Sequence, residues 1–262
     1  MLRTRLITAI VLIPLVVGAV VLGGWWLFAL MGSAMVLCGY EYFTILHSGG
    51  YRPERAVGVV LIAALLVDAL LQLRLQSWLL VLAVIVPPIW EFRRAEHSGF
   101  LVNWSLTVLG VLYIGLLGGY MFLLRARPDG LVLLAVTLLA TWAADAAAYG
   151  VGRSIGRRPF FQHISPKKTW EGAIGGVAGS AIAFGVLMSI YGLNPFVALL
   201  CGIGLGVAAA VGDLLESLIK RQVMIKDSGT LIVGHGGVLD RLDSMFFTVA
   251  FAYFFFALIG NA

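Results

Sequence analysis

The strongest constraint on the fold of this chain is its series of long apolar runs separated by short polar loops. A membrane-spanning helix needs about 20 mostly apolar residues. Nine segments come near that length: 6–23, 25–46, 56–73, 76–92, 101–124, 130–150, 171–193, 195–219 and 243–260. Only 12% of the residues are charged, whereas about 25% is usual in soluble domains. We therefore predict an all-α, polytopic integral membrane protein of about nine transmembrane helices.

The loops between these runs are too short for a separate soluble domain. The longest are 151–170 and 220–242. We therefore predict one membrane domain over residues 1–262, with spans one to five in 1–129 and spans six to nine in 130–262. No clear small-residue cleavage site follows the first apolar run, so we interpret that run as a span rather than a signal peptide.

The distribution of lysine and arginine predicts the orientation. With nine spans, Arg74, Arg125 and Arg127 fall on one side of the membrane, and the rest of the 18 basic residues fall on the other. Basic loops remain in the cytoplasm, so we expect a cytoplasmic N-terminus with loops 151–170 and 220–242 on the same side. Because the basic residues lie in short loops between spans, the net charge of +5 does not indicate a nucleic-acid partner.

Acidic residues gather near the predicted cytoplasmic ends of spans six, eight and nine. One face of span eight carries four polar residues with i, i+3, i+4, i+7 spacing: Asp213, Glu216, Ser217 and Lys220. Asp240 and Asp243 would share a helix face if span nine begins near Val238, and Asp145 lies near the end of span six. A carboxylate within a span is costly unless it is paired or binds a cation. We therefore expect three acidic helix ends to meet at one depth.

The residues around these acids are suited to phosphate chemistry. Carboxylates from different elements commonly hold Mg²⁺ beside a phosphate. Gly234, Gly236 and Gly237 would let backbone N–H groups approach an anion, and His235 adds a donor or proton-transfer group. Six cations suited to phosphate lie in the same loops: Lys167, Lys168, Lys220, Arg221, Lys226 and Arg241. This combination indicates metal-assisted transfer of a phosphorus-containing group.

Several of these residues also have a plainer interpretation. Asp213 and Lys220 could form a structural pair within the membrane, and His235 could be a structural histidine. Arg153, Arg157 and Arg158 could simply follow the positive-inside rule. Cys38 and Cys201 lie inside apolar runs and belong to no Cys/His cluster, so we predict neither a disulfide nor a cysteine metal site.

The run from Ser217 to Ser244, SLIKRQVMIKDSGTLIVGHGGVLDRLDS, resembles the signature of the phosphatidate cytidylyltransferases (CDP-diacylglycerol synthases). That signature joins a Ser-x-x-Lys-Arg start, a Lys-Asp pair, a His-Gly-Gly turn and an Asp-Arg-x-Asp end. The runs ISPKKTWEG and RLITAIVLIPLVV are also similar to the family, so the resemblance covers most of the chain.

The resemblance implies a reaction of CTP with phosphatidate that gives CDP-diacylglycerol and pyrophosphate in phospholipid biosynthesis. It implies Mg²⁺ as the cofactor, with room for a second cation. It also implies an active site that faces the cytoplasm from the cell inner (plasma) membrane, where the enzyme meets membrane lipid. The glycine-rich spans would permit a homodimer.

Carried onto this sequence, the resemblance implies three groups of site residues. The catalytic group is Lys226, Asp227, His235, Asp240, Arg241 and Asp243. The substrate-binding group is Lys167, Lys168, Ser217, Lys220, Arg221, Gly236 and Gly237. The metal ligands are Asp213 and Asp240 first, followed by Asp243 and Asp145.

Two positions depart from the family pattern. Val233 stands where the family usually has proline, and Ala146 stands where a serine or threonine usually follows the acid of span six. Neither change removes a carboxylate or a cation, but each could reduce activity or alter substrate handling.

Two other functions stay open on sequence grounds. One is a transporter of an anionic solute, although transporter sites usually lie near the bilayer midplane and these charges cluster at one face. The other is a CTP-dependent lipid kinase, which would release CDP instead of pyrophosphate.

Overall fold

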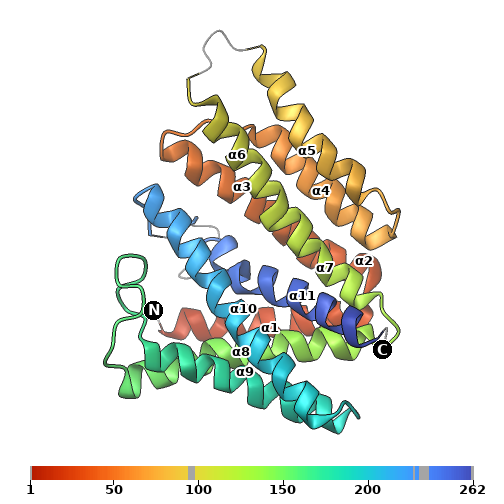
Figure 1. The fold of residues 1–262 in the computed structure, drawn as a ribbon, viewed down its shortest axis with the longest axis vertical. Helices are drawn as coiled ribbons and strands as arrows, with labels where there is room; N and C mark the ends of the chain where they lie inside the picture. The colour runs from red at the N-terminus through yellow and green to blue at the C-terminus, as the bar shows by residue number, and fades with distance from the viewer. Residues whose placement is uncertain (1, 94–97, 227, 230–235, 261–262) are drawn as a thin grey trace. The chain divides into compact units, whose positions relative to one another are not determined.

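The computed structural model describes residues 2–93, 98–226, 228–229 and 236–260, with side chains from residue 12 onward. Within these ranges every regular element is a helix (Figure 1), which confirms the all-α prediction. The helices are α1 (Leu2–Leu22), α2 (Gly24–Leu27), η1 (Phe28–Gly32), α3 (Ser33–Ser48), α4 (Arg55–Leu71), α5 (Gln76–Glu91), α6 (Phe100–Gly110), η2 (Val111–Leu116), α7 (Leu117–Arg125), α8 (Gly130–Ile155), α9 (Trp170–Ile190), α10 (Pro195–Gln222) and α11 (Leu239–Ile259).

Each predicted apolar run coincides with one helix or with a continuous helical run. Among the described residues, six helical segments are long and apolar enough to cross a membrane: Gly24–Ser48, Phe100–Arg125, Gly130–Ile155, Trp170–Ile190, Pro195–Gln222 and Leu239–Ile259. Helices α4 and α5 have 17 and 16 residues, which is short for a span. A multi-span membrane protein is thus supported, whereas the count of nine and the orientation stay predictions.

The chain divides into two compact units. Unit 1 comprises Met1–Ala126 and Lys220–Leu242, and unit 2 comprises Arg127–Ile219 and Asp243–Ala262. Helices α10 and α11 therefore each contribute residues to both units.

In unit 1, small residues let the helices around α3 pack closely. Phe43 of α3 is fully buried, and a Cβ on Gly58 of α4 or on Gly110 of α6 would collide with its ring. Gly115 of η2 lies against the backbone of Ile62 in α4, where a Cβ would be 3.0 Å from the Ile62 Cα. Close backbone approach through glycine is the usual way in which helices associate in a membrane.

In unit 2, α9 packs between α8 and α10 through small residues. A Cβ on Gly179 of α9 would lie 2.9 Å from the carbonyl oxygen of Ala143 in α8. On the other side, a Cβ on Gly206 of α10 would lie 2.6 Å from the Cα of Val177. Such glycines explain the runs GGVAGSAIAFG and CGIGLGVAAAVG, because a larger side chain would separate the helices.

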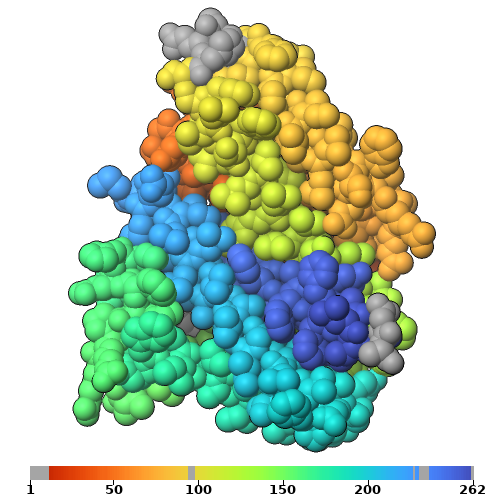
Figure 2. Space-filling view, viewed as in Figure 1, coloured from red at the N-terminus to blue at the C-terminus, as the bar shows by residue number. Residues whose placement is uncertain are grey.

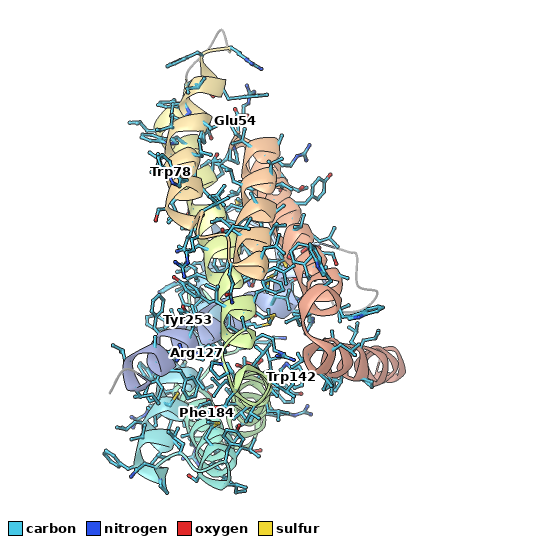
Figure 3. All side chains as sticks on the ribbon, turned by 90° about the vertical axis from the view of Figure 1, so that its right-hand side faces the viewer. Glu54, Trp78, Arg127, Trp142, Phe184 and Tyr253 are labelled. Atoms are coloured by element: carbon cyan, nitrogen blue, oxygen red, sulfur yellow. The ribbon has the colours of Figure 1, made fainter. Side chains whose placement is uncertain are left out.

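Unit 2 carries large apolar side chains both in its core and on the outer faces of its helices. Phe184 of α9 is fully buried, while Arg127 donates to the Phe256 carbonyl at 3.0 Å and lies 5.9 Å from the Tyr253 ring centroid (Figure 3). Helices α9 and α10 form much of the surface of unit 2 seen in Figure 2. Ile182 of α9 and Val207 of α10 are among their exposed side chains. Exposed aliphatic side chains on long apolar helices are expected where lipid is the solvent.

Candidate active site

Helix α11 begins at Leu239, so Asp240 and Asp243 lie one turn apart on the same helix, as predicted. Helix α10 continues to Gln222, so Asp213 and Lys220 lie two turns apart on that helix. The sequence spacing thus places the acids on helices correctly, and their partners come from the tertiary structure of each unit.

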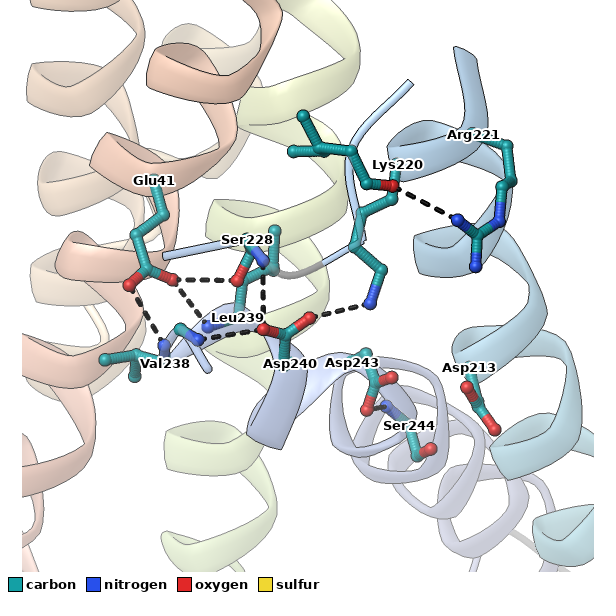
Figure 4. Close-up of polar contacts among 12 residues, drawn as sticks. Glu41, Asp213, Lys220, Arg221, Ser228, Val238, Leu239, Asp240, Asp243 and Ser244 are labelled. Carbon is teal, nitrogen blue, oxygen red and sulfur yellow. Dashed lines mark hydrogen bonds and ion pairs between the residues drawn. The ribbon is translucent and has the colours of Figure 1, made fainter. Parts of the chain in front are cut away.

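In unit 1, the largely buried carboxylate of Asp240 accepts hydrogen bonds from Lys220, Ser228 and Gly237 (Figure 4). Lys220 Nζ lies 2.7 Å from its Oδ1. Its Oδ2 accepts the backbone N–H groups of Ser228 at 3.0 Å and Gly237 at 2.8 Å. The side chains of Asp240 and Lys220 are only 10% and 12% exposed. The bond to Gly237 reaches back three residues, as the acidic residue of a capping box does, and it helps to start α11.

The two glycines before α11 have a structural reason of their own. Gly236 has a φ of +82°, a conformation that glycine adopts without steric cost. A Cβ on Gly237 would collide with the Ser228 hydroxyl and with the Glu41 carboxylate. Both glycines are therefore required by the local fold, and their predicted contact with substrate stays a prediction.

Glu41 of α3 is a residue of this region that our sequence analysis left unassigned. It is 4% exposed. Its carboxylate accepts the N–H groups of Val238 at 3.0 Å and Leu239 at 2.9 Å, and the hydroxyl of Ser228 at 3.2 Å. The only sequence signal was a carboxylate inside an apolar run, which is uncommon in a span. We call this set of contacts the Glu41–Asp240 network; its members are Glu41, Lys220, Ser228, Gly237, Val238, Leu239 and Asp240.

In unit 2, Asp213 forms an ion pair with Lys168, whose Nζ lies 2.5 Å from its Oδ2. The side chains of Asp213 and Lys168 are 39% and 26% exposed, so this Lys168–Asp213 pair is more open than the network of unit 1, although the Lys168 Nζ atom is itself buried. Asp213 thus pairs with Lys168 within unit 2, and Asp240 pairs with Lys220 within unit 1.

The loop between α8 and α9 presents Lys168 through backbone hydrogen bonds. Glu171 accepts the N–H groups of Arg157 at 3.0 Å and Arg158 at 3.2 Å. Thr169 caps α9 by accepting the N–H of Gly172 at 3.1 Å. An isolated β-bridge between Pro159 and Thr169 closes the loop. Lys168 thereby occupies an ordered position directly before α9, and Lys167 beside it is exposed.

The other predicted residues of unit 2 lie on α8, α10 and α11. A Cβ on Gly212 would lie 2.7 Å from the carbonyl oxygen of Asp243, so α10 and α11 approach closely beside Asp213. Ser217 is buried on α10. Asp145 is exposed on α8, as is Ala146, one of the two departures from the family pattern. Unit 2 thus brings Asp213 and Asp243 to neighbouring helices.

The remaining predicted residues lie in unit 1 or outside the described chain. Lys226 and Arg241 are exposed, and Arg221, also exposed, donates to the Ile225 carbonyl at 3.3 Å. Asp227 and His235, together with Gly234 and Val233, lie outside the described residues, so their predicted roles stay predictions.

The predicted metal site has ligands in both units. Asp213 belongs to unit 2 and Asp240 to unit 1, so their joint binding of a cation stays a prediction. Within the described ranges there is no group of three or more His, Cys, Asp or Glu residues arranged to hold a metal ion. Fewer protein ligands are common for Mg²⁺, which keeps several waters and takes the rest of its oxygen ligands from substrate phosphates.

The chain is similar to known proteins over almost its whole length. A model of the cytidylyltransferase family matches residues 3–259. A phosphatidate cytidylyltransferase of Synechocystis sp. is 34% identical, with 97% of this chain and 96% of that protein covered. That of Pseudomonas aeruginosa is 34% identical over 94% of this chain and 93% of its own. Phosphatidate cytidylyltransferase 4, chloroplastic, of Arabidopsis thaliana is 35% identical over 93% and 70%.

Proposed function

Because the chain belongs to the cytidylyltransferase family, we propose that its two polar regions serve the synthesis of CDP-diacylglycerol and pyrophosphate from CTP and phosphatidate. The observation that carries this function is the similarity to phosphatidate cytidylyltransferases of bacteria and plants over both units. The chain is thus a nucleotidyltransferase of phospholipid biosynthesis, and the roles of its individual residues are our proposal.

The reaction joins two anions. An oxygen of the phosphatidate phosphate attacks the α-phosphorus of CTP, and the bond from that phosphorus to the oxygen that bridges to the β-phosphate breaks, which releases pyrophosphate. The nucleophile is already ionised near neutral pH, so a strong general base is not required. Charge repulsion is then the main part of the barrier, and cations positioned near the phosphates lower it.

The lysines and arginines of the two units supply these cations. Lys226 and Arg241 are exposed, and their long side chains can reach phosphate oxygens in water. Lys168 is held before α9 and Lys220 is held by Asp240, so each offers an ammonium group at a fixed place. We propose that these four residues bind the phosphates of CTP and phosphatidate, with Lys167 and Arg221 beside them.

The acidic residues fit a divalent cation by their chemistry. Carboxylate oxygens are the donors that Mg²⁺ prefers, and the Asp213 carboxylate is open enough to exchange its lysine partner for a metal ion. We propose that Asp213, Asp240 and Asp243 hold Mg²⁺, with Asp145 as a further ligand. Bound Mg²⁺ would neutralise phosphate charge and polarise the α-phosphorus.

We also propose where the enzyme works. The basic loops favour a cytoplasmic N-terminus and an active site on the cytoplasmic face of the inner membrane, where CTP is available. Gln72→Cys and Gln162→Cys, both at exposed positions, test this with a membrane-impermeant maleimide on intact cells. Gln72→Cys should react at once and Gln162→Cys only after permeabilisation; the reverse pattern contradicts the orientation.

We further propose that the protein forms a homodimer. Light scattering tests this by measuring the mass of the detergent-solubilised protein.

Labelled CTP tests the function itself. Purified protein receives Mg²⁺, phosphatidate and CTP that carries the label in either the α- or the γ-phosphate. We expect α-label in CDP-diacylglycerol and γ-label in pyrophosphate. With diacylglycerol in place of phosphatidate, we expect no labelled lipid from either nucleotide. Transfer of γ-label to lipid would identify a kinase, and intact protein that yields no CDP-diacylglycerol would contradict the proposal.

A further inference from the structure

A buried carboxylate of α3 lies at the start of α11 within unit 1. Glu41 is 4% exposed, and Tyr42 and Phe43 beside it are fully buried. A carboxylate in such surroundings is costly unless strong hydrogen bonds compensate for its lost water. The donors that compensate Glu41 therefore indicate what this residue does.

Among the described residues, these donors come from the two chain segments that surround Asp240. Glu41 Oε1 accepts the N–H of Val238 at 3.0 Å, and Oε2 accepts the N–H of Leu239 at 2.9 Å. These N–H groups belong to the first turn of α11, which has no partner for them inside the helix. A negative charge at a helix N-terminus is favourable as well. Glu41 thus caps α11 from another helix, 198 positions away in the sequence from Leu239.

The second segment that Glu41 holds is Ser228–Gly229. The Ser228 hydroxyl donates to Glu41 Oε2 at 3.2 Å. The backbone also comes very close, since a Cβ on Gly229 would lie 2.6 Å from Glu41 Oε1 and one on Gly237 would lie 2.5 Å from Oε2. The space around the carboxylate therefore admits only glycine at both positions, and the two segments converge on this one side chain.

The same two segments orient Asp240. Its Oδ2 accepts the N–H groups of Ser228 and Gly237, and its Oδ1 receives Lys220. Glu41 touches Ser228 and the residues that follow Gly237, so it is one contact removed from Asp240 (Figure 4). A displaced Glu41 would move both N–H donors, and the carboxylate of Asp240 would turn with them.

We propose that Glu41 is a positioning residue, which fixes the N-terminus of α11 and Ser228 and thereby sets the direction of the Asp240 carboxylate. This inference rests on the proposed role of Asp240 in the synthesis of CDP-diacylglycerol. Glu41 itself does not contact substrate in this scheme. Its effect is therefore expected on the rate of turnover rather than on the binding of CTP.

Glu41→Gln is the test variant, because glutamine keeps the volume but turns an NH₂ group toward donors that need an acceptor. Asp68→Asn is the matched control. Asp68 is a buried carboxylate of unit 1 (6% exposed) that accepts the N–H of Leu75 at 2.8 Å and lies outside the Glu41–Asp240 network. Both variants lose one buried charge, so a loss that depends only on stability should appear in both.

Two readouts on folded, purified protein decide the proposal. We expect Glu41→Gln to lower kcat about tenfold or more while the KM for CTP changes less than about threefold. We also expect faster amide hydrogen exchange at Ser228 and Gly237. Asp68→Asn should keep the kcat and the exchange of those amides. Wild-type kcat in Glu41→Gln, or an equal loss of kcat in both variants, would overturn the proposal.

A second variant keeps the test decisive if Glu41→Gln does not fold. Gly229→Ala places a methyl group against the Glu41 carboxylate and should displace it, with a smaller loss of kcat and the same rise in exchange at Gly237. Wild-type kcat and exchange in Gly229→Ala would overturn the proposal. Amide exchange is measured without substrate, so it tests the role of Glu41 independently of the activity. Unchanged exchange in both variants would count against Glu41. A wild-type protein that makes no CDP-diacylglycerol would refute only the proposed function.

Discussion

The two polar regions of the molecule differ in how tightly they hold their carboxylates. In unit 1, Asp240 is 10% exposed and engages a lysine and two backbone N–H groups, which Glu41 supports. In unit 2, Asp213 is 39% exposed and pairs with Lys168, which the α8–α9 loop presents. Buried networks fix geometry because every unmet donor is costly, whereas an open ion pair contributes little and exchanges easily.

This difference suggests a division of work between the units. The Glu41–Asp240 network is suited to hold a carboxylate in one direction during the reaction. The Lys168–Asp213 pair is suited to open when a phosphate or a divalent cation arrives, because Lys168 can pass to the phosphate and Asp213 to the metal. If this is correct, the same Asp→Asn change should affect stability very differently in the two units.

The largest effect is expected from Asp240→Asn. The change removes the carboxylate that Asp240 offers to the largely buried Lys220 ammonium, and loss of one partner of a buried ion pair costs roughly 3–5 kcal/mol. Turnover should fall about a hundredfold or more, as when an electrostatic group of an active site is removed. Unfolding in detergent and formation of CDP-diacylglycerol measure the two effects. Wild-type turnover would refute the role of Asp240, and wild-type stability would refute the network.

A large effect on turnover with a smaller effect on stability is expected from Asp213→Asn. The Asp213 carboxylate is 39% exposed, although the Lys168 Nζ atom beside it is buried, so its loss should cost less stability than the loss of Asp240. Turnover should nevertheless fall about a hundredfold if Asp213 holds the cation. Asp129→Asn is the control, since Asp129 accepts a hydrogen bond from Tyr191 at 2.9 Å and has no place in the proposed site. Equal turnover in the two variants would show that Asp213 has no role in the active site.

A moderate effect is expected from Glu171→Gln. The variant weakens the hydrogen bonds to the N–H groups of Arg157 and Arg158, so the loop that presents Lys168 should become less ordered. We expect the KM for CTP to rise about threefold to tenfold with kcat nearly unchanged, the pattern of weakened ground-state binding. Steady-state kinetics with varied CTP measure this. A fall in kcat at constant KM would show that the loop acts in the chemical step instead.

The smallest effect is expected from Thr141→Val in the core of unit 2. Thr141 Oγ1 lies 3.0 Å from the hydroxyl of Thr248, and both residues are buried. Valine keeps the shape of the threonine side chain, and the Thr248 hydroxyl still donates to the Met245 carbonyl at 3.2 Å. Stability should therefore fall by about 1 kcal/mol or less. Turnover should stay at the wild-type level. A loss of turnover here would mean that the polar regions alone do not set the rate.

The sequence predicted the helices well, because an apolar run of span length satisfies its backbone hydrogen bonds in lipid by forming an α-helix. It also placed Asp240 and Asp243 on one helix, since that needs only local spacing. The ion-pair partners of these acids were harder to predict from the sequence. Lys220 lies seven residues from Asp213 on α10, yet Asp213 pairs with Lys168, because the α8–α9 loop brings that lysine to α10.

Glu41 shows most clearly what the sequence leaves open. Its partners Val238 and Leu239 lie 197 and 198 positions away, and no local pattern joins them. A lone acid within an apolar run signals that some compensation exists, but only the tertiary structure identifies the donors. The roles of Asp227 and His235 rest on the motif alone, since both lie outside the described residues.

The most direct test of the central claim is the turnover of the double variant Lys220→Met with Asp240→Asn. The claim is that this buried pair belongs to the working site and is not merely a structural ion pair. Replacing both partners removes the ammonium together with its carboxylate, so stability should return to within about 1–2 kcal/mol of the wild type. Turnover should nevertheless stay about a hundredfold or more below the wild type. A stable double variant that makes CDP-diacylglycerol at the wild-type rate would contradict the claim.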